Sequence, residues 1–300
     1  MKTKVIIVAC VKGGVGKTTL VAAMGDVLAR KMEQKVLLID SDPQANLSRR
    51  FGYDDRNPVN NSLDVYMLTE MEALNGKGER IEAQNFISPC AKYSRRLNSK
   101  AKTYENLDIV VADKVMDQIY SQYAGTGNAG SILIKFINNI KKLNIYDYII
   151  IDTQPNISFI MQELLKAADY VITPVTPNVD AFAGANSIGL AYNKALEEKR
   201  VYNPDANIEF LGALINKNKN NTIVSRELRS EIDHIWKDNE IFETVIPNSQ
   251  DVESSEFKKA APVTIAYPAS SASIKLVAAT HEIVDKINKL EKKYKGAAQA

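Results

Sequence analysis

The sequence predicts an α/β protein built on a mainly parallel, twisted sheet with helices on both faces. Short apolar runs rich in Val and Ile alternate along the chain with longer amphipathic stretches, which is typical of strand–helix–strand units. Most of the runs are apolar throughout, as expected for strands that helices cover on both sides. A glycine-rich turn also separates the first run from the first amphipathic stretch.

The elements follow in order along the chain. β-branched residues pack well in a pleated sheet, so the apolar runs predict strands at residues 5–10, 36–39, 107–111, 148–151, 170–173, 210–215 and 242–246. Apolar residues at helical spacing predict helices at residues 20–32, 131–143, 183–196, 224–236 and 273–295.

One segment, residues 52–106, interrupts this alternation. It has few strand signals and contains Asn-Pro, Asn-Gly and Lys-Gly turn signals, so we expect a long connection with one or two short helices, such as residues 63–74. No clear boundary divides the chain. We therefore expect a single domain over residues 1–300, with an insertion-like segment at 52–106 and a terminal helix and tail at 273–300.

The composition excludes several classes of protein. Lys and Arg number 38 and Asp and Glu 36, so the net charge of +2 neither demands nor excludes an anionic partner. Cys10 and Cys90 are the only cysteines, which excludes a disulfide framework or a cysteine-rich metal site within one chain. The sequence has neither a secretory signal nor an apolar run near the ~18 residues of a spanning helix. We expect a cytoplasmic protein.

The clearest motif is Lys-Gly-Gly-Val-Gly-Lys-Thr-Thr at residues 12–19. It lies between a predicted strand and a predicted helix, the context of a phosphate loop, and so predicts a P-loop fold. Glycines let backbone N–H groups converge on an anion, and the helix N-terminus adds its positive dipole end. We expect Lys17 to reach the β- and γ-phosphates, Thr18 to ligate Mg²⁺ and Thr19 to bind the α-phosphate. The rest of the cradle is Gly13, Gly14, Val15 and Gly16.

Acidic residues follow two other predicted strands. Asp40 and Asp42 come after the strand at 36–39, and Asp152 ends the strand at 148–151. Ligands of open α/β sheets bind outside the carboxyl ends of the strands, so these acids should face the phosphate loop. We expect Asp152 to hold Mg²⁺ through water, with Asp40 behind it, and Asp42 to orient or deprotonate an attacking water. The alternative is a pair of turn-forming aspartates before Pro43.

These motifs resemble the family of ParA partition ATPases, MinD and the nitrogenase iron protein. The lysine at position 12 corresponds to the deviant Walker A motif, and Asp-x-Asp-Pro-Gln-x-Asn at 40–46 resembles the second ParA block. The resemblance covers almost the whole chain. It implies an ATP hydrolase that uses ATP and Mg²⁺ and forms a homodimer around two nucleotides, with Lys12 reaching the partner's phosphates. The catalytic residues would be Lys12, Lys17 and Asp42.

The resemblance also implies contacts and partners. Pro247 lies in a block whose loop approaches the adenine, and Asn216 is a further adenine candidate, with an ordinary polar loop residue as the equal alternative. The ATP-bound dimer would bind DNA without sequence preference, on the nucleoid, and a ParB-like adaptor would stimulate hydrolysis. The candidate DNA contacts are Lys217, Lys219, Arg226 and Arg229, then Lys286, Lys289, Lys292 and Lys293; solvated helix faces are the alternative.

Other members of the superfamily suggest other tasks. The chain begins at its first strand, so we expect no operator-specific helix-turn-helix. An iron protein needs paired cysteines, which are missing. The second hypothesis is a MinD-like positioning ATPase that acts on membrane or another cargo. Residues 287–296 are basic but poor in bulky apolar anchors, so membrane binding is the less favoured task.

Overall fold

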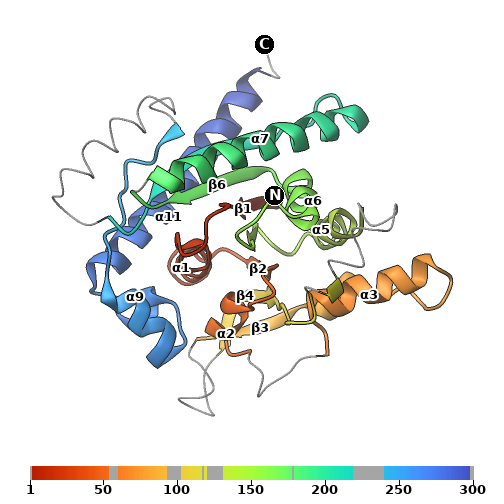
Figure 1. Cartoon of the computed structure of the whole chain (residues 1–300), viewed down its shortest axis with the longest axis horizontal. Coiled ribbons are helices and arrows are strands. Elements are labelled where there is room, and N and C mark those ends of the chain that lie inside the picture. The colour runs from red at the N-terminus through yellow and green to blue at the C-terminus, as the bar shows by residue number, and fades with distance from the viewer. Residues whose placement is uncertain are drawn as a thin grey trace.

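The computed structural model describes residues 2–53, 60–92, 103–116, 118–119, 131–177, 179–218 and 240–297. Within these ranges, seven strands form one sheet in the order β3-β4-β2-β5-β1-β6-β7 (Figure 1). The parallel strands are β1 (Lys4–Val8), β2 (Val36–Asp40), β4 (Thr103–Val110), β5 (Tyr148–Asp152), β6 (Tyr170–Val175) and β7 (Glu209–Ile215). The short β3 (Ser88–Ala91) is antiparallel to β4. The predicted fold class is confirmed.

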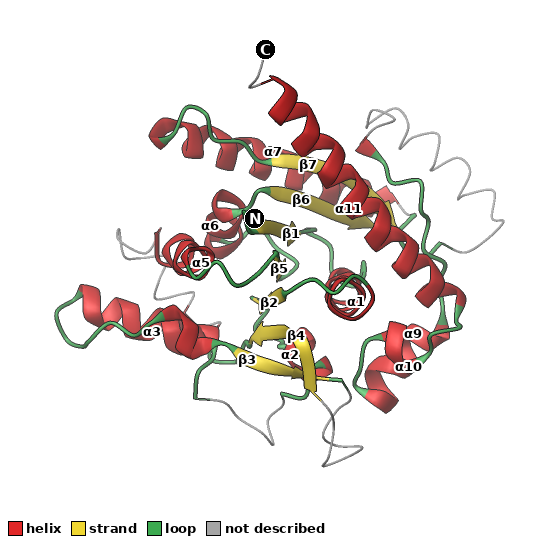
Figure 2. Cartoon of the chain, turned by 180° about the vertical axis from the view of Figure 1, so that it is seen from behind, coloured by secondary structure: helices red, strands yellow, loops and turns green. Residues whose placement is uncertain are grey.

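Helices cover both faces of the sheet. Figure 2 shows the strands stacked from β7 to β3, with α5 (Ile132–Lys142) and α6 (Phe159–Ala167) on one side and α1 (Lys17–Lys31) and α11 (Ser271–Ala297) on the other. Successive side chains of a strand point to opposite faces. Val5 and Ile7 of β1 accordingly join the core under α5 and α6, and Ile6 and Val8 join the core under α1 and α11. This two-sided burial explains why the strand sequences are continuously apolar.

Six of the seven predicted strands are present, as β1, β2, β4, β5, β6 and β7. The prediction of a strand at 242–246 is wrong. Among the described residues this segment makes only isolated bridges to the β7 edge, at Ile241 and Pro247. The backbone N–H groups of Glu243 and Thr244 instead donate to the Glu282 carboxylate of α11, at 2.7 and 3.0 Å. Phe242 and Ile246 still donate to the carbonyl oxygens of Ala213 and Ile215, so the Glu282 carboxylate interrupts the ladder between them.

The predicted helices at 20–32, 131–143, 183–196 and 273–295 appear as α1, α5, α7 (Val179–Tyr202) and α11. The helix predicted at 224–236 lies outside the described residues. The 52–106 connection contains α3 (Leu63–Leu74), as predicted, and a 3₁₀ turn η1 (Ala83–Phe86). It also contains β3, which sequence reasoning missed because the strand has four residues and includes Pro89.

Candidate nucleotide-binding site

The sheet order brings the predicted site residues to one edge. Strands β2, β5 and β1 are neighbours, and their carboxyl ends lie level: Asp40 pairs in register with Asp152, and Asp152 with Val8. The phosphate loop leaves β1 after Val8 and enters α1 at Lys17. The structure thus places Asp40, Asp152 and the loop together, as the strand-end rule predicts.

The phosphate loop depends on glycine at its last turn. Gly16 has a φ of +93°, in the left-handed region that glycine adopts without strain. A Cβ there would lie 2.1 Å from Nδ2 of Asn216. That amide reaches the loop from the end of β7 and donates to the carbonyl oxygen of Val15 at 2.7 Å. Asn216 therefore supports the backbone of the phosphate loop.

Lys17 lies buried inside the site. Its Nζ donates to the carbonyl oxygen of Lys12 at 3.3 Å, which closes the loop on itself. Burial lowers the pKa of the Lys17 ammonium, whereas the carboxylates of Asp152 and Asp42 raise it. The side chain of Lys12 begins in the same loop and is half-buried.

The environment of the Asp152 carboxylate suits the binding of a cation. Both carboxylate oxygens are buried and have no hydrogen-bond partner in the described part of the chain. Burial and then the neighbouring Asp40 raise the pKa of this carboxyl, while Thr18 and Lys17 lower it. A buried carboxylate without a partner is costly, and Mg²⁺ with its shell of water would satisfy it. The residues present thus fit Mg²⁺, with Thr18 beside Asp152.

Asp40 has a different environment. Its Oδ1 accepts a hydrogen bond from the N–H of Asp42 at 3.2 Å, and its Oδ2 accepts from the N–H and the hydroxyl of Ser48 at 2.8 and 2.7 Å. Asp40 therefore holds the turn between β2 and α2 (Asn46–Arg50). Asp42 lies in that turn and accepts from the N–H of Gln44 at 2.9 Å, so it is a turn former as well as a residue of the site.

Ser48 ties this turn to the sheet, and its loss should be costly. Its hydroxyl donates to Asp40 and accepts from the N–H of Ala112 at 3.1 Å. Ser48→Ala leaves a buried carboxylate and a buried amide short of a partner, so the free energy of unfolding should fall by about 2–4 kcal/mol. Urea denaturation followed by circular dichroism measures it, with the exposed Ser131→Ala as control. A fall below about 0.5 kcal/mol would contradict this view of the turn.

A cavity of about 340 Å³ lies in front of the loop, within the range of small-molecule sites. Its lining includes Gly13, Gly14, Gly16, Lys17, Thr18, Thr19, Asp42, Asn216, Lys217, Pro247 and Val252. The structure therefore brings the phosphate loop, the predicted water-orienting acid and both adenine candidates to one cavity.

The residues predicted to contact DNA lie in different environments. Lys217 lines the cavity, and Lys219, Arg226 and Arg229 lie outside the described residues. Lys286 is turned inward: its Nζ donates to the carbonyl oxygens of Leu211 and Ile241 at 3.0 and 3.4 Å and lies 4.3 Å from the centre of the Phe242 ring. Its ammonium thus binds the backbone beside β7 instead of facing solvent.

Sequence reasoning missed two residues of the site, Arg50 and Glu256. The Nη2 of Arg50 donates to the hydroxyl of Thr19 at 3.2 Å and pairs with Glu256, while Thr19 donates to Oε1 of Glu256 at 3.1 Å. Both residues line the cavity. No motif contains either of them, and they lie far apart in the sequence, so no local signal pointed to the pair.

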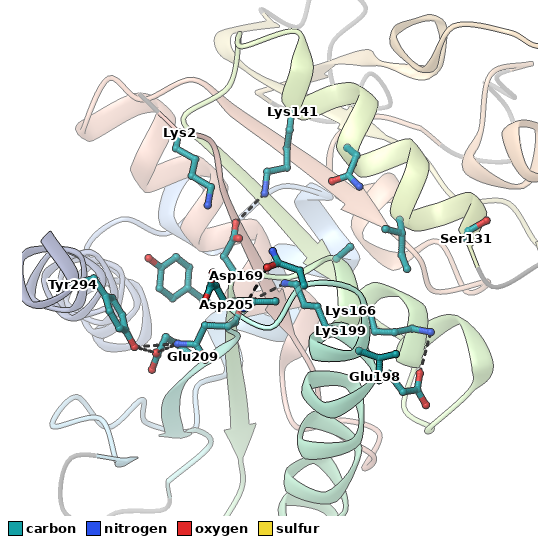
Figure 3. Close-up of a pocket in the computed structure, with 18 of the residues that line it drawn as sticks. Lys2, Ser131, Lys141, Lys166, Asp169, Glu198, Lys199, Asp205, Glu209 and Tyr294 are labelled. Atoms are coloured by element: carbon teal, nitrogen blue, oxygen red, sulfur yellow. Dashed lines mark hydrogen bonds and ion pairs between the residues drawn. The ribbon is translucent and has the colours of Figure 1, made fainter. Parts of the chain in front are cut away.

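A larger cavity, of about 1230 Å³, lies at the opposite edge of the sheet, where β6 and β7 begin (Figure 3). Several of its charged groups are held by ion pairs or hydrogen bonds. Lys141 pairs with Asp169 at 3.3 Å, Lys166 pairs with Glu198 at 3.2 Å, and the hydroxyl of Tyr294 donates to Glu209. It is remote from the phosphate loop, so we assign the nucleotide to the smaller cavity.

A phosphate loop between the first strand and helix, with acids at the ends of two neighbouring strands, defines a P-loop nucleotide-binding protein. The family model described as an AAA domain matches residues 3–208, and the chain therefore belongs to this family of P-loop ATPases. The predicted enzyme class, an ATP hydrolase, follows from that membership.

Similarity to curated proteins indicates which group of P-loop ATPases the chain resembles. The virulence plasmid ParA family protein pGP5-D of Chlamydia psittaci is 29% identical over 182 residues, which cover 59% of this chain and 58% of that protein. The sporulation initiation inhibitor protein Soj of Bacillus subtilis is 26% identical over 246 residues, covering 82% of this chain and 85% of Soj. The resemblance to ParA-type ATPases is thus confirmed.

Solved structures agree on the fold. The septum site-determining protein MinD of Pyrococcus horikoshii, complexed with Mg-ADP, superposes with a TM-score of 0.67 at 20% identity, covering 96% of this chain and 97% of MinD. At this identity the likeness shows the fold. In the described part of our chain, none of the helices combines the length and the apolar character needed to cross a bilayer.

Proposed function

We propose that this chain is a Mg²⁺-dependent partition ATPase. It binds ATP, forms a homodimer around two nucleotides, binds DNA without sequence preference and moves a plasmid or chromosome together with a ParB-like adaptor. The observation that carries the nucleotide chemistry is the unpartnered buried carboxylate of Asp152 beside Lys17 and the phosphate loop. The similarity to a plasmid ParA family protein and to Soj supports the choice of partition.

Each residue then has a separate task. Thr18 and Asp152 would hold Mg²⁺, which when bound neutralises charge on the phosphate oxygens. Asp40 keeps its hydrogen bonds to Asp42 and Ser48 and so positions the turn instead of touching the ion. Lys17 binds the β- and γ-phosphates. Phosphoryl transfer needs mostly positioning and charge, so one carboxylate, Asp42, suffices to orient the water.

The C-terminal helix favours DNA over membrane as the surface that the protein binds. A membrane-anchoring helix must present a free apolar face. Most apolar side chains of α11, including Ile283 and Ile287, are buried in the core against α1, and Leu290 packs against them, whereas Ile274 is exposed. Near the end of the helix, Tyr294 is hydrogen-bonded to Asn207 and Glu209. These contacts leave α11 without a free apolar stripe over its described length.

Co-sedimentation separates the two tasks. We expect the protein to pellet with plasmid DNA when ATP and Mg²⁺ are present, and not with ADP or without nucleotide. Liposomes containing anionic lipid should not pellet it under any of these conditions. Lys17→Ala is the control for nucleotide dependence. ATP-dependent pelleting with liposomes, and none with DNA, would favour the MinD-like positioning ATPase.

Asp42→Ala should separate nucleotide binding from turnover. Asp42 lines the cavity, and the Asp42→Ala variant keeps the charges of Lys17 and Asp152 that would bind nucleotide and metal. We expect near-normal ATP binding and dimerisation on size exclusion, hydrolysis reduced by about 100-fold or more, and protein trapped on DNA. Phosphate release measures the rate. A variant that turns over at the wild-type rate would assign the water to another residue.

A further inference from the structure

Thr19, Arg50 and Glu256 form a closed cluster on the wall of the nucleotide cavity. The hydroxyl of Thr19 donates to Oε1 of Glu256 at 3.1 Å and accepts from Nη2 of Arg50 at 3.2 Å, and Arg50 also pairs with Glu256. Three elements distant in sequence meet here: α1, α2 and the π-helical turn η4 (Ser255–Lys259). A carboxylate thus lies against the hydroxyl that is expected to bind a phosphate.

Arg50 has hydrogen-bond donors that this cluster does not use. Only 8% of its side chain is exposed, and its buried Nη1 has no hydrogen-bond partner among the described residues. A buried guanidinium with unpaired donors is costly, and a phosphate accepts two parallel N–H bonds from such a group. Arg50 lines the same cavity as Lys17 and Thr18, so its guanidinium adds positive charge to the wall that an anion in that cavity would meet.

The two members of the ion pair differ in freedom to move. The Glu256 side chain is 34% exposed, whereas Arg50 is enclosed by the protein. A carboxylate at the rim regains water when it turns outward, while the enclosed guanidinium, which also feels the carboxylates of Asp152 and Asp40, cannot reach water in the same way. If one partner gives way to an incoming anion, it is therefore Glu256.

We infer that Arg50 and Thr19 form an anion subsite for a phosphate group of the nucleotide, and that the carboxylate of Glu256 competes with that phosphate for both residues. The inference rests on the proposed binding of ATP at the phosphate loop. It assigns the two residues opposite effects: Arg50 raises nucleotide affinity, and Glu256 lowers it. A purely structural ion pair would instead make both residues support the site in the same direction.

Binding of a fluorescent, non-hydrolysable ATP analogue with Mg²⁺ tests this opposition. Glu256→Gln keeps the shape and removes the competing charge, so we expect affinity to rise by roughly 3- to 30-fold. Arg50→Met removes the cation and should weaken binding by roughly 10- to 100-fold. Arg50→Lys keeps a charge without the planar pair of donors and should fall between Arg50→Met and wild type. Asp251→Asn is the control, because it removes a negative charge from α9 (Gln250–Ser254) outside the cavity lining.

The outcomes separate the hypotheses. Tighter binding by Glu256→Gln, together with weaker binding by Arg50→Lys and no comparable gain in Asp251→Asn, supports the subsite. Unchanged or weaker binding by a Glu256→Gln protein with a normal thermal unfolding curve overturns it, while leaving the phosphate loop as the nucleotide site. If the wild-type protein itself fails to bind the analogue, the proposed function is wrong and the subsite falls with it. Arg50→Lys keeps the test valid if Arg50→Met does not fold.

Discussion

Replacing Lys17 by alanine should abolish measurable nucleotide binding. The Lys17 ammonium is buried at the carboxyl edge of the sheet, where the nearest charges are the carboxylates of Asp152 and Asp42. Without it, the loop loses its buried cation, and a triphosphate would face the carboxylates of Asp152 and Asp42 with no lysine ammonium to offset them. Charge-assisted contacts of this kind are worth about 1.5–3 kcal/mol each, and in the proposed mechanism Lys17 contacts two phosphates, so affinity should fall by at least about 100-fold.

Titration of a fluorescent ATP analogue measures this loss. Lys31→Ala is a suitable control, because Lys31 lies at the other end of α1 and is exposed. The variant must also keep the wild-type far-ultraviolet circular dichroism spectrum, which shows that the loop mutation spares the fold. Near-normal affinity in a folded Lys17→Ala protein would overturn the assignment of the nucleotide to this loop.

Lys12→Ala should spare nucleotide binding and remove hydrolysis. Within its own chain, Lys12 contributes its carbonyl oxygen to Lys17, and alanine retains that group. By the proposed mechanism, its side chain acts on the nucleotide of the partner subunit, as a cationic finger does. Such groups are worth roughly 10³–10⁵ in rate. We therefore expect binding by the monomer, a loss of turnover of that order, and weaker ATP-dependent DNA binding.

Mixing two inactive variants tests the geometry of the dimer. In the proposed dimer, a heterodimer of Lys12→Ala and Lys17→Ala would have one site with an intact Lys17, and the intact Lys12 of the other subunit would face it. Some ATPase activity should return on mixing, and it should rise with the fraction of heterodimer. A Lys12→Ala protein with the wild-type rate and normal ATP-dependent DNA binding would show that the homodimer mechanism does not apply to this chain.

The predictable part of the site lies in short, contiguous stretches of the sequence. The phosphate loop is a contiguous motif, and Asp40 and Asp152 end apolar runs whose carboxyl ends lie at one edge of the sheet once the sheet is parallel. Arg50 and Glu256 follow no such rule, because their meeting depends on how α2 and η4 pack at the rim of the cavity. The same reasoning explains the error at 242–246, where a carboxylate of α11 captures the backbone donors.

The position of β1 has a consequence for synthesis. Strand β1 precedes both of its neighbours in the sequence: it lies between β5 and β6 in the sheet, with Lys4 paired to Tyr148 and Ile6 to Tyr170. About half of the chain must therefore be made before β1 has a neighbour. Closing so long a loop costs entropy before any pairing offsets it, so we expect slow folding and an apolar segment that is exposed on the nascent chain until then. The loop at residues 12–19 is therefore translated well before the two strands that hold β1 in place.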